Sequence, residues 1–225
     1  MPKNKKLIIF DWDGTLMDSI DRIVSSIQNA ARKAGLAVPS EALASSVIGL
    51  SLNKALAIVF PTADEPTINH LIELYREEYI ELNPTPTPLF ADAKACLQQL
   101  REQGYLLAVA TGKARAGLSR AMASVGLNDF FDASICADES RSKPDPLMLT
   151  LLLKKFNVPV ETAIMVGDSV HDLKMAQAAG MMSVAVTMGA DSAERLAAYQ
   201  PIAIVDSLSQ LTSVIQQLSL TQAED

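Results

Sequence analysis

The chain has 225 residues, and its 19 Lys and Arg against 26 Asp and Glu give a formal net charge of −7. This acidic balance argues against a protein that holds nucleic acid through a basic surface. Hydrophobic residues make up 49% and charged residues 20%, which excludes a disordered chain, and two cysteines are too few for a disulfide framework.

The first residues resemble the start of a signal peptide, because lysines precede an apolar run. That run covers only residues 7–10, however, and Asp11 and Asp13 follow it. A secretory signal needs about 7–15 apolar residues, and a membrane span needs about 20. We therefore expect a cytoplasmic protein with no membrane partner, in which Cys96 and Cys136 stay reduced.

Short apolar runs with β-branched residues predict fully buried strands. These runs lie at residues 7–10, 106–110, 134–136, 163–166 and 183–186, with a weaker one at 202–205. Helical segments are predicted at residues 92–103, 145–156 and 170–179, and Asp191 with Glu194 could form a capping box. Strands that alternate with helices from residue 90 onward indicate a parallel sheet covered on both faces.

Residues 18–83 do not follow this alternation. Apolar residues with helical spacing predict two long helices, at 20–34 and 68–82, and two shorter ones, at 40–47 and 51–60. Prolines at alternate positions of residues 84–88 predict a stiff connector back to the sheet. We therefore expect an α/β fold with a doubly wound, mostly parallel sheet (residues 1–17 and 84–225) and an inserted four-helix cap domain (residues 18–83).

Polar residues follow several of the predicted strands. Asp11 and Asp13 come directly after the first strand. Thr111 and Gly112, Lys143, and Asp168 with Asp172 follow later strands or their connections. The carboxyl ends of parallel strands meet at one edge of a sheet, where open α/β sheets bind their ligands. The sequence therefore predicts one site that contains all of these side chains.

Charge predicts what this site binds. Four ionised carboxylates and one ammonium sum to −4 + 1 = −3, which repels a phosphate dianion. A divalent cation and one proton retained on a carboxylate bring the sum to zero. Carboxylate ligands without a matching His or Cys set favour a hard cation, and Mg²⁺ fits best.

Four motifs in this order resemble those of the haloacid dehalogenase superfamily, in its phosphatase branch with a small helical cap. Asp11-x-Asp13-Gly14-Thr15 is similar to its first motif, Thr111 to the second, Lys143 to the third, and Gly167-Asp168-x-x-x-Asp172 to the fourth. The resemblance spans residues 6–190 and is greatest to the phosphoglycolate-phosphatase-like group. Trp12 and Gly112 depart from the residues common in that group.

The resemblance implies a role for each acidic residue. Asp11 would be the nucleophile that forms an aspartyl-phosphate. Asp13 would be the general acid that protonates the leaving alcohol, and then the base that activates water. The carboxylates of Asp11 and Asp168 and the backbone carbonyl of Asp13 would hold Mg²⁺, while Asp172 would position metal-bound waters or Lys143.

The resemblance also implies where the substrate binds. Thr111, Gly112 and Lys143, with nearby backbone N–H groups, would hold the phosphoryl oxygens. Gly49 and Ser51 lie in a break between two cap helices that fits the family's specificity loop, although a plain interhelical turn is the alternative. We expect His171 to be a polar helix residue with no role in metal binding or acid–base chemistry. Trp12 could either pack beneath the site or line it.

Several functions are compatible with these motifs. The first is a Mg²⁺-dependent phosphatase of a small phosphorylated metabolite, with phosphoglycolate as the leading named candidate. A sugar phosphomutase would place Arg after the loop Ser, where this chain has Leu52, and a dehalogenase would lack the second aspartate. A binding or regulatory protein is opposed by the intact Asp11, Asp13, Lys143 and Asp168. The sequence leaves a monomer and a homodimer equally open.

Overall fold

A computed structural model describes residues 6–221 and places six strands in one parallel sheet. The strands are β1 (Leu7–Phe10), β2 (Leu106–Ala110), β3 (Ala133–Ile135), β4 (Ala163–Gly167), β5 (Met182–Val186) and β6 (Ala203–Val205). Their order is β3-β2-β1-β4-β5-β6, and every neighbouring pair is parallel. The chain thus winds outward from β1 in both directions, as predicted. The order reverses beside β1, which is where such sheets bind ligands.

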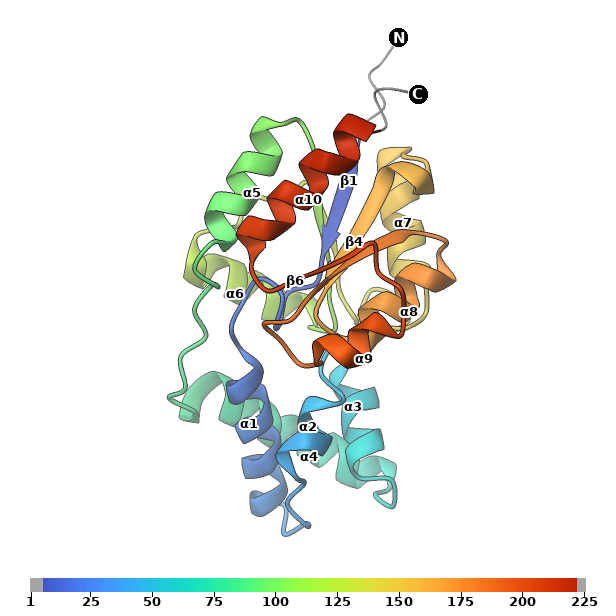
Figure 1. Ribbon diagram of the computed structural model, residues 1–225. Coiled ribbons are helices and arrows are strands. Elements are labelled where there is room, and N and C mark those ends of the chain that lie inside the picture. Colours follow the sequence, from blue (N-terminus) through green and yellow to red (C-terminus); the bar gives the residue numbers. More distant parts are fainter. Residues whose placement is uncertain (1–5, 222–225) are drawn as a thin grey trace.

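Helices cover both faces of the sheet (Figure 1). On one face, Ile8 and Phe10 of β1 pack with α5 (Ala93–Glu102), α6 (Arg115–Val125) and α10 (Leu208–Thr221). On the other face, Leu7 and Ile9 pack with α7 (Leu147–Phe156) and α8 (Val170–Ala178). Because successive strand residues point to opposite faces, a continuous apolar run such as residues 7–10 builds two cores at once.

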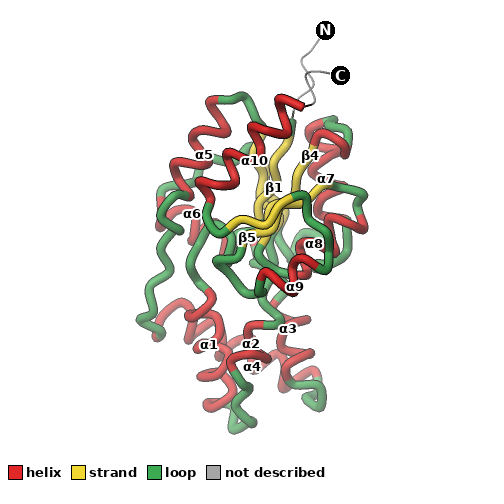
Figure 2. Tube along the Cα trace, in the orientation of Figure 1, coloured by secondary structure: helices red, strands yellow, loops and turns green. Residues whose placement is uncertain are grey.

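Four further helices lie beyond the carboxyl edge of the sheet, around the chain that leaves β1 (Figures 1 and 2). They are α1 (Ile20–Lys33), α2 (Glu41–Ser45), α3 (Leu52–Val59) and α4 (Glu65–Glu77), and a π-helical turn, η1 (Glu78–Leu82), extends α4. Their buried residues form an apolar cluster of their own, which includes Ile27, Leu56 and Leu71. We therefore propose that residues 18–83 are the inserted cap domain and that residues 1–17 and 84–225 are the core domain.

The helices of the structure differ from the predicted ones in a cap, in a start position and in the presence of two helices that were not predicted. The predicted capping box at Asp191 and Glu194 is wrong. The short helix α9 (Ala193–Ala197) is capped by Ser192, whose hydroxyl accepts the N–H of Arg195, and the Asp191 carboxylate instead accepts the N–H of Val170 at 2.8 Å. Helix α7 begins after Pro146 rather than at it. Helices α6 and α10 were not predicted.

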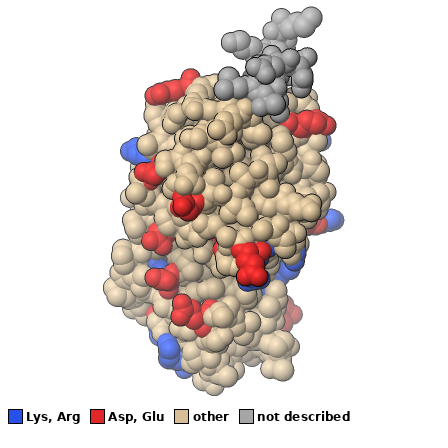
Figure 3. All heavy atoms as spheres, viewed as in Figure 1, with Lys and Arg blue, Asp and Glu red and all other residues tan. Residues whose placement is uncertain are grey.

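The surface gives two further observations. Among residues 6–221, no helix has the length and apolarity that crossing a membrane requires. On the face shown in Figure 3, acidic and basic side chains are scattered over both the sheet region and the cap helices.

Candidate active site

The chain leaves β1 directly beside the end of β4. Asp11 continues the pairing of the two strands by donating its N–H to the carbonyl of Val166 at 2.9 Å. Gly14, with φ +76°, carries the loop against Asp168, where any side chain at position 14 would collide with the carboxylate. Thr15 then donates its hydroxyl to Asp168 at 2.7 Å. The D-x-D-G-T segment is thus fixed against the fourth strand by its own residues.

Lys143 lies between two carboxylates and has no solvent-exposed surface. Its ammonium is 2.7 Å from Asp11 and 2.6 Å from Asp172. Burial alone would lower the pKa of Lys143, but the charges of Asp11 and Asp172 outweigh it, so the pKa lies above its ordinary value. Lys143 is therefore a permanently charged group at the bottom of the site.

Asp168 is buried and accepts two hydrogen bonds, from the Thr15 hydroxyl and from the N–H of Ala190 at 2.8 Å. Burial, reinforced by the charge of Asp172, outweighs these bonds and raises the pKa of Asp168 to about 7. Burial also raises the pKa of Asp11 well above its ordinary value, although the nearby Lys143 opposes it. The site therefore has fewer positive charges than carboxylates, and a bound cation would relieve both Asp11 and Asp168.

Asp11, Asp168 and Asp172 form the one group of candidate metal ligands found in the described part of the chain. Each offers a carboxylate oxygen, and these oxygens all lie within 4.8 Å of one another. Asp172 is already engaged, because it accepts hydrogen bonds from Lys143 and, at 2.6 Å, from the Ser169 hydroxyl. Asp11, which pairs with Lys143, is the least engaged of the three, and each oxygen of Asp168 accepts one hydrogen bond. A purely oxygen donor set with excess negative charge fits a hard divalent cation such as Mg²⁺.

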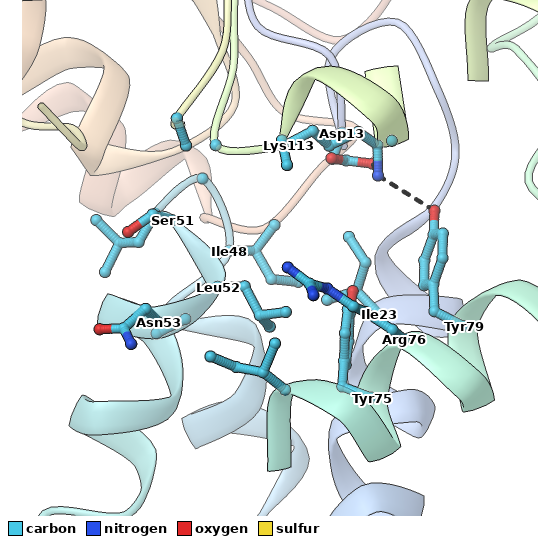
Figure 4. A pocket seen from close by; sticks show the side chains of 18 of the residues that line it. Asp13, Ile23, Ile48, Ser51, Leu52, Asn53, Tyr75, Arg76, Tyr79 and Lys113 are labelled. Atoms are coloured by element: carbon cyan, nitrogen blue, oxygen red, sulfur yellow. Dashed lines mark hydrogen bonds and ion pairs between the residues drawn. The ribbon is translucent and has the colours of Figure 1, made fainter. Parts of the chain in front are cut away.

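Asp13 is not a member of this group of carboxylates. Its Oδ1 is 2.9 Å from the Lys113 ammonium and accepts a hydrogen bond from the Ser19 hydroxyl at 2.5 Å. Lys113 also donates to the Tyr79 hydroxyl at 3.3 Å, which links the core to the cap (Figure 4). The two aspartates of the first motif therefore face different partners, as two distinct chemical roles require.

Lys113, Ser19 and Tyr79 were not predicted as residues of this site from the sequence. A weak signal existed for Lys113, since it directly follows Thr111 and Gly112 at the end of β2. Nothing in the sequence pairs Tyr79 with Lys113, because Tyr79 lies in the helical segment between β1 and β2 and Lys113 follows β2. Their contact depends on how the cap packs on the core.

Thr111 and Gly112 lie at the end of β2, the strand beside β1. Thr111 is buried, and its hydroxyl accepts the N–H of Lys113 at 3.2 Å. A side chain at Gly112 would collide with the carbonyl oxygens of Gly49 and Leu50. The loop between two cap helices thus rests directly on the β2 end of the core.

That loop, residues 46–51, and the first turn of α3 are anchored over the edge of the sheet. The N–H of Ser51 donates to the Ser142 hydroxyl at 2.9 Å, and Lys54 donates to the carbonyl of Lys143 at 3.1 Å. Gly49 and Ser51 line a cavity of about 710 Å³ that Asp11 and Asp13 also line. Their contact with a substrate stays a prediction.

His171 and Trp12, whose positions the sequence left open, both lie outside the group of carboxylates. The Nε2 atom of His171 lies 3.0 Å from the carbonyl oxygen of Ser46 in the cap, and burial lowers the pKa of the imidazole. The ring thus contacts the cap and is outside the carboxylate group. Trp12 is fully buried, donates to the Met17 sulfur and packs its ring against Phe131. It packs in the sheet core and does not line the cavity.

Comparison with known proteins shows which protein family this chain belongs to. Residues 8–186 match the model of the haloacid dehalogenase-like hydrolases. The chain is 34% identical to "Probable phosphatase IndB" of Dickeya dadantii (strain 3937), over 95% of each chain. It is 30% identical to a phosphoglycolate phosphatase of Vibrio cholerae serotype O1, over 95% of this chain and 98% of the relative. A solved structure described as a predicted phosphoglycolate phosphatase of Haemophilus somnus 129PT superposes with a TM-score of 0.83 at 26% identity, over 96% of this chain and all of the other.

Proposed function

This chain belongs to the haloacid dehalogenase-like hydrolases and is an enzyme of their phosphatase kind, and we propose that it hydrolyses small phosphomonoesters with Mg²⁺ through an aspartyl-phosphate. One observation carries the proposal. Asp11, Asp168 and Lys143 come from three distant parts of the chain and converge at one sheet edge, within reach of a shared cation and phosphate.

In the first half-reaction, a carboxylate oxygen of Asp11 attacks phosphorus, and the bond from phosphorus to the ester oxygen breaks. Asp13 transfers its proton to that oxygen, so that the product leaves as a neutral alcohol. Ser19 and Lys113 hold the Asp13 side chain in place for this transfer. Bound Mg²⁺ would supply positive charge that reduces repulsion between Asp11 and the phosphate.

In the second half-reaction, Asp13 takes a proton from water, whose oxygen attacks phosphorus. The bond to Asp11 breaks, and inorganic phosphate and free Asp11 are released. Lys143, Thr111 and the backbone at Gly112 would stabilise the charge that spreads over the phosphoryl oxygens in both steps. Asp172 would position Lys143, which it contacts at 2.6 Å.

Phosphoglycolate is the first substrate to assay, because several relatives carry that name. The experiment measures release of phosphate from phosphoglycolate and from an aryl phosphate, with Mg²⁺ and with a chelator, in the wild type and in Asp11→Asn. Asp129→Asn, at an exposed position outside the cavity, is the matched control. We expect Mg²⁺-dependent release that Asp11→Asn abolishes and Asp129→Asn leaves unchanged. Release of phosphate in the chelator, or unchanged release by Asp11→Asn, would contradict the proposal.

A further inference from the structure

The cavity between cap and core is larger and more apolar than phosphate chemistry alone requires. At about 710 Å³, it falls in the range of sites that enclose drug-sized molecules. Much of its cap side is apolar, with Ile23, Ile48, Leu52 and Ile72 among the lining residues. A phosphate, its metal and a two-carbon alcohol would leave most of this space to water.

One wall of the cavity is aromatic. Tyr75 and Tyr79, one helical turn apart, stack with ring centroids 5.7 Å apart and planes inclined by 23°. Lys113 and Arg22 each lie near the Tyr79 ring, at 4.8 and 5.1 Å from its centroid, and help to fix it. A rigid aromatic wall favours a flat or apolar group beside it.

Among the charged side chains that line the cavity, Arg76 and Arg120 are given no partner by the residues that the structure describes, and Arg76, on α4, is the one on the cap side. Asp11 is paired with Lys143, and Asp13 with Lys113. Within residues 6–221, the structure gives the Arg76 guanidinium neither an ion pair nor a hydrogen bond. Figure 4 shows this side chain directed from α4 into the cavity, on the opposite side from Asp13 and Lys113.

The orientation of a bound ester follows from these positions. Its phosphate must lie at Asp11, so its leaving group extends across the cavity toward the cap, beside Tyr75 and toward Arg76. A planar guanidinium binds carboxylates and phosphates through paired, charge-assisted hydrogen bonds. An anionic group at the far end of the substrate would supply the partner that Arg76 lacks.

We infer that the preferred substrate is a phosphomonoester whose leaving alcohol has an apolar or aromatic body and ends in a second anionic group, and that Arg76 binds this group. The inference rests on the proposed phosphatase activity and narrows its substrate class. It makes Arg76 a specificity-determining residue that takes no part in the chemical step.

The test compares two esters that differ by one carboxylate, benzyl phosphate and 4-carboxybenzyl phosphate, together with phosphoglycolate. We expect wild-type kcat/KM to be highest for 4-carboxybenzyl phosphate. Arg76→Gln should lower that value roughly tenfold to a hundredfold, as expected for a lost charge-assisted pair, and should change the value for benzyl phosphate less than about threefold. Arg76→Lys should lie between the wild type and Arg76→Gln, because it keeps the charge but not the planar fork.

Two matched arginines serve as controls. Arg120→Gln removes another cation that lines the cavity, from α6 on the core side, and Arg32→Gln removes an exposed cation of the cap outside the cavity. Both should keep the preference for the carboxylated ester. Because Arg76 is exposed to solvent, thermal melts of its variants should match that of the wild type.

The outcomes separate the inference from the proposed function. Equal losses for both benzyl esters in Arg76→Gln, a selective loss in Arg120→Gln instead, or a preference for phosphoglycolate would overturn the inference and leave the phosphatase proposal intact. If the wild type hydrolysed none of the three esters with Mg²⁺, the phosphatase proposal and the inference would both be wrong.

Discussion

Asp13 lies beside a basic and a hydroxyl partner rather than among the candidate metal ligands, which suits proton transfer. An alkyl leaving group needs a proton far more than a nitrophenolate does. Asp13→Asn should therefore slow the first half-reaction about 10²- to 10⁴-fold for an alkyl phosphate, and much less for 4-nitrophenyl phosphate. The measurement is the pre-steady-state burst of alcohol release. Equal slowing of both substrates would exclude Asp13 as the general acid.

Lys143 neutralises two buried carboxylates, so its removal affects stability as well as activity. Lys143→Met should lower the free energy of unfolding by about 3–5 kcal/mol, because it leaves buried charge without compensation. The double variant Lys143→Met/Asp172→Asn should recover part of this loss but no activity. Urea unfolding of metal-free protein measures both effects, and a fully stable Lys143→Met single variant would contradict the account.

At the scale of elements, the contact between the cap loop and the end of β2 is made by backbone on both sides. Gly112→Ala should push the loop at Gly49 and Leu50 away from the core, because the added methyl group would meet two carbonyl oxygens. We expect kcat/KM to fall at least about tenfold, since small misplacements in a site are costly.

Gly117→Ala provides the control for this prediction. Gly117 also lines the cavity, but a methyl group there would meet only the Lys113 side chain, at 4.0 Å. Its kcat/KM should stay close to that of the wild type. Equal activity in the two variants would show that the cap loop does not need its contact with Gly112.

The elements also show why the sequence predicted the strands of the sheet better than the helices that pack on it. Runs such as residues 7–10 and 163–166 are apolar on both faces, a pattern that few structures other than a buried parallel strand explain. Helix α6 was missed because only Leu118 and Met122 are buried on it and Gly117 lowers its helix propensity. Asp191 has the residue type of a cap, but a tertiary contact with Val170 and a local ion pair with Arg195 engage it instead.

The residues of the candidate site also differ in how well the sequence predicts their positions. The convergence of Asp11, Lys143 and Asp168 follows from parallel-sheet topology, so the sequence could predict it. The link from Asp13 through Lys113 to Tyr79 could not be predicted, because it depends on how the separate apolar cluster of α1 to α4 packs on the sheet. The position of Arg76 in the cavity has the same origin.

For the whole molecule, binding of a metal by the buried carboxylates would be coupled to stability and pH. The pKa of Asp168 rises from 3.8 to about 7 on folding, so folding favours its protonated form. Its contribution to stability is therefore present below about pH 4 and is lost as the pH rises to 7. Mg²⁺ should compensate for this loss above pH 7, where Asp168 is ionised.

Thermal melts with Mg²⁺ and with a chelator test this coupling at pH 5 and pH 8. At a concentration of one hundred times its Kd, Mg²⁺ should stabilise the protein by about 2.7 kcal/mol at pH 8 and by clearly less at pH 5. Asp168→Asn should remove the response to Mg²⁺, whereas Asp129→Asn should keep it. A response of equal size at both pH values would contradict the assignment of Asp168 as a metal ligand.

The central claim is that Asp11 is the nucleophile at a metal and phosphate site assembled from separate strand ends. Its most direct test is rapid-quench peptide mapping by mass spectrometry during turnover of an aryl phosphate with Mg²⁺. If Asp11 is the nucleophile, a transient phosphoryl group should appear on the peptide that contains Asp11. This group should not appear without Mg²⁺ or in Asp11→Asn. Steady turnover with no adduct on that peptide, or with an adduct on another residue, would contradict it.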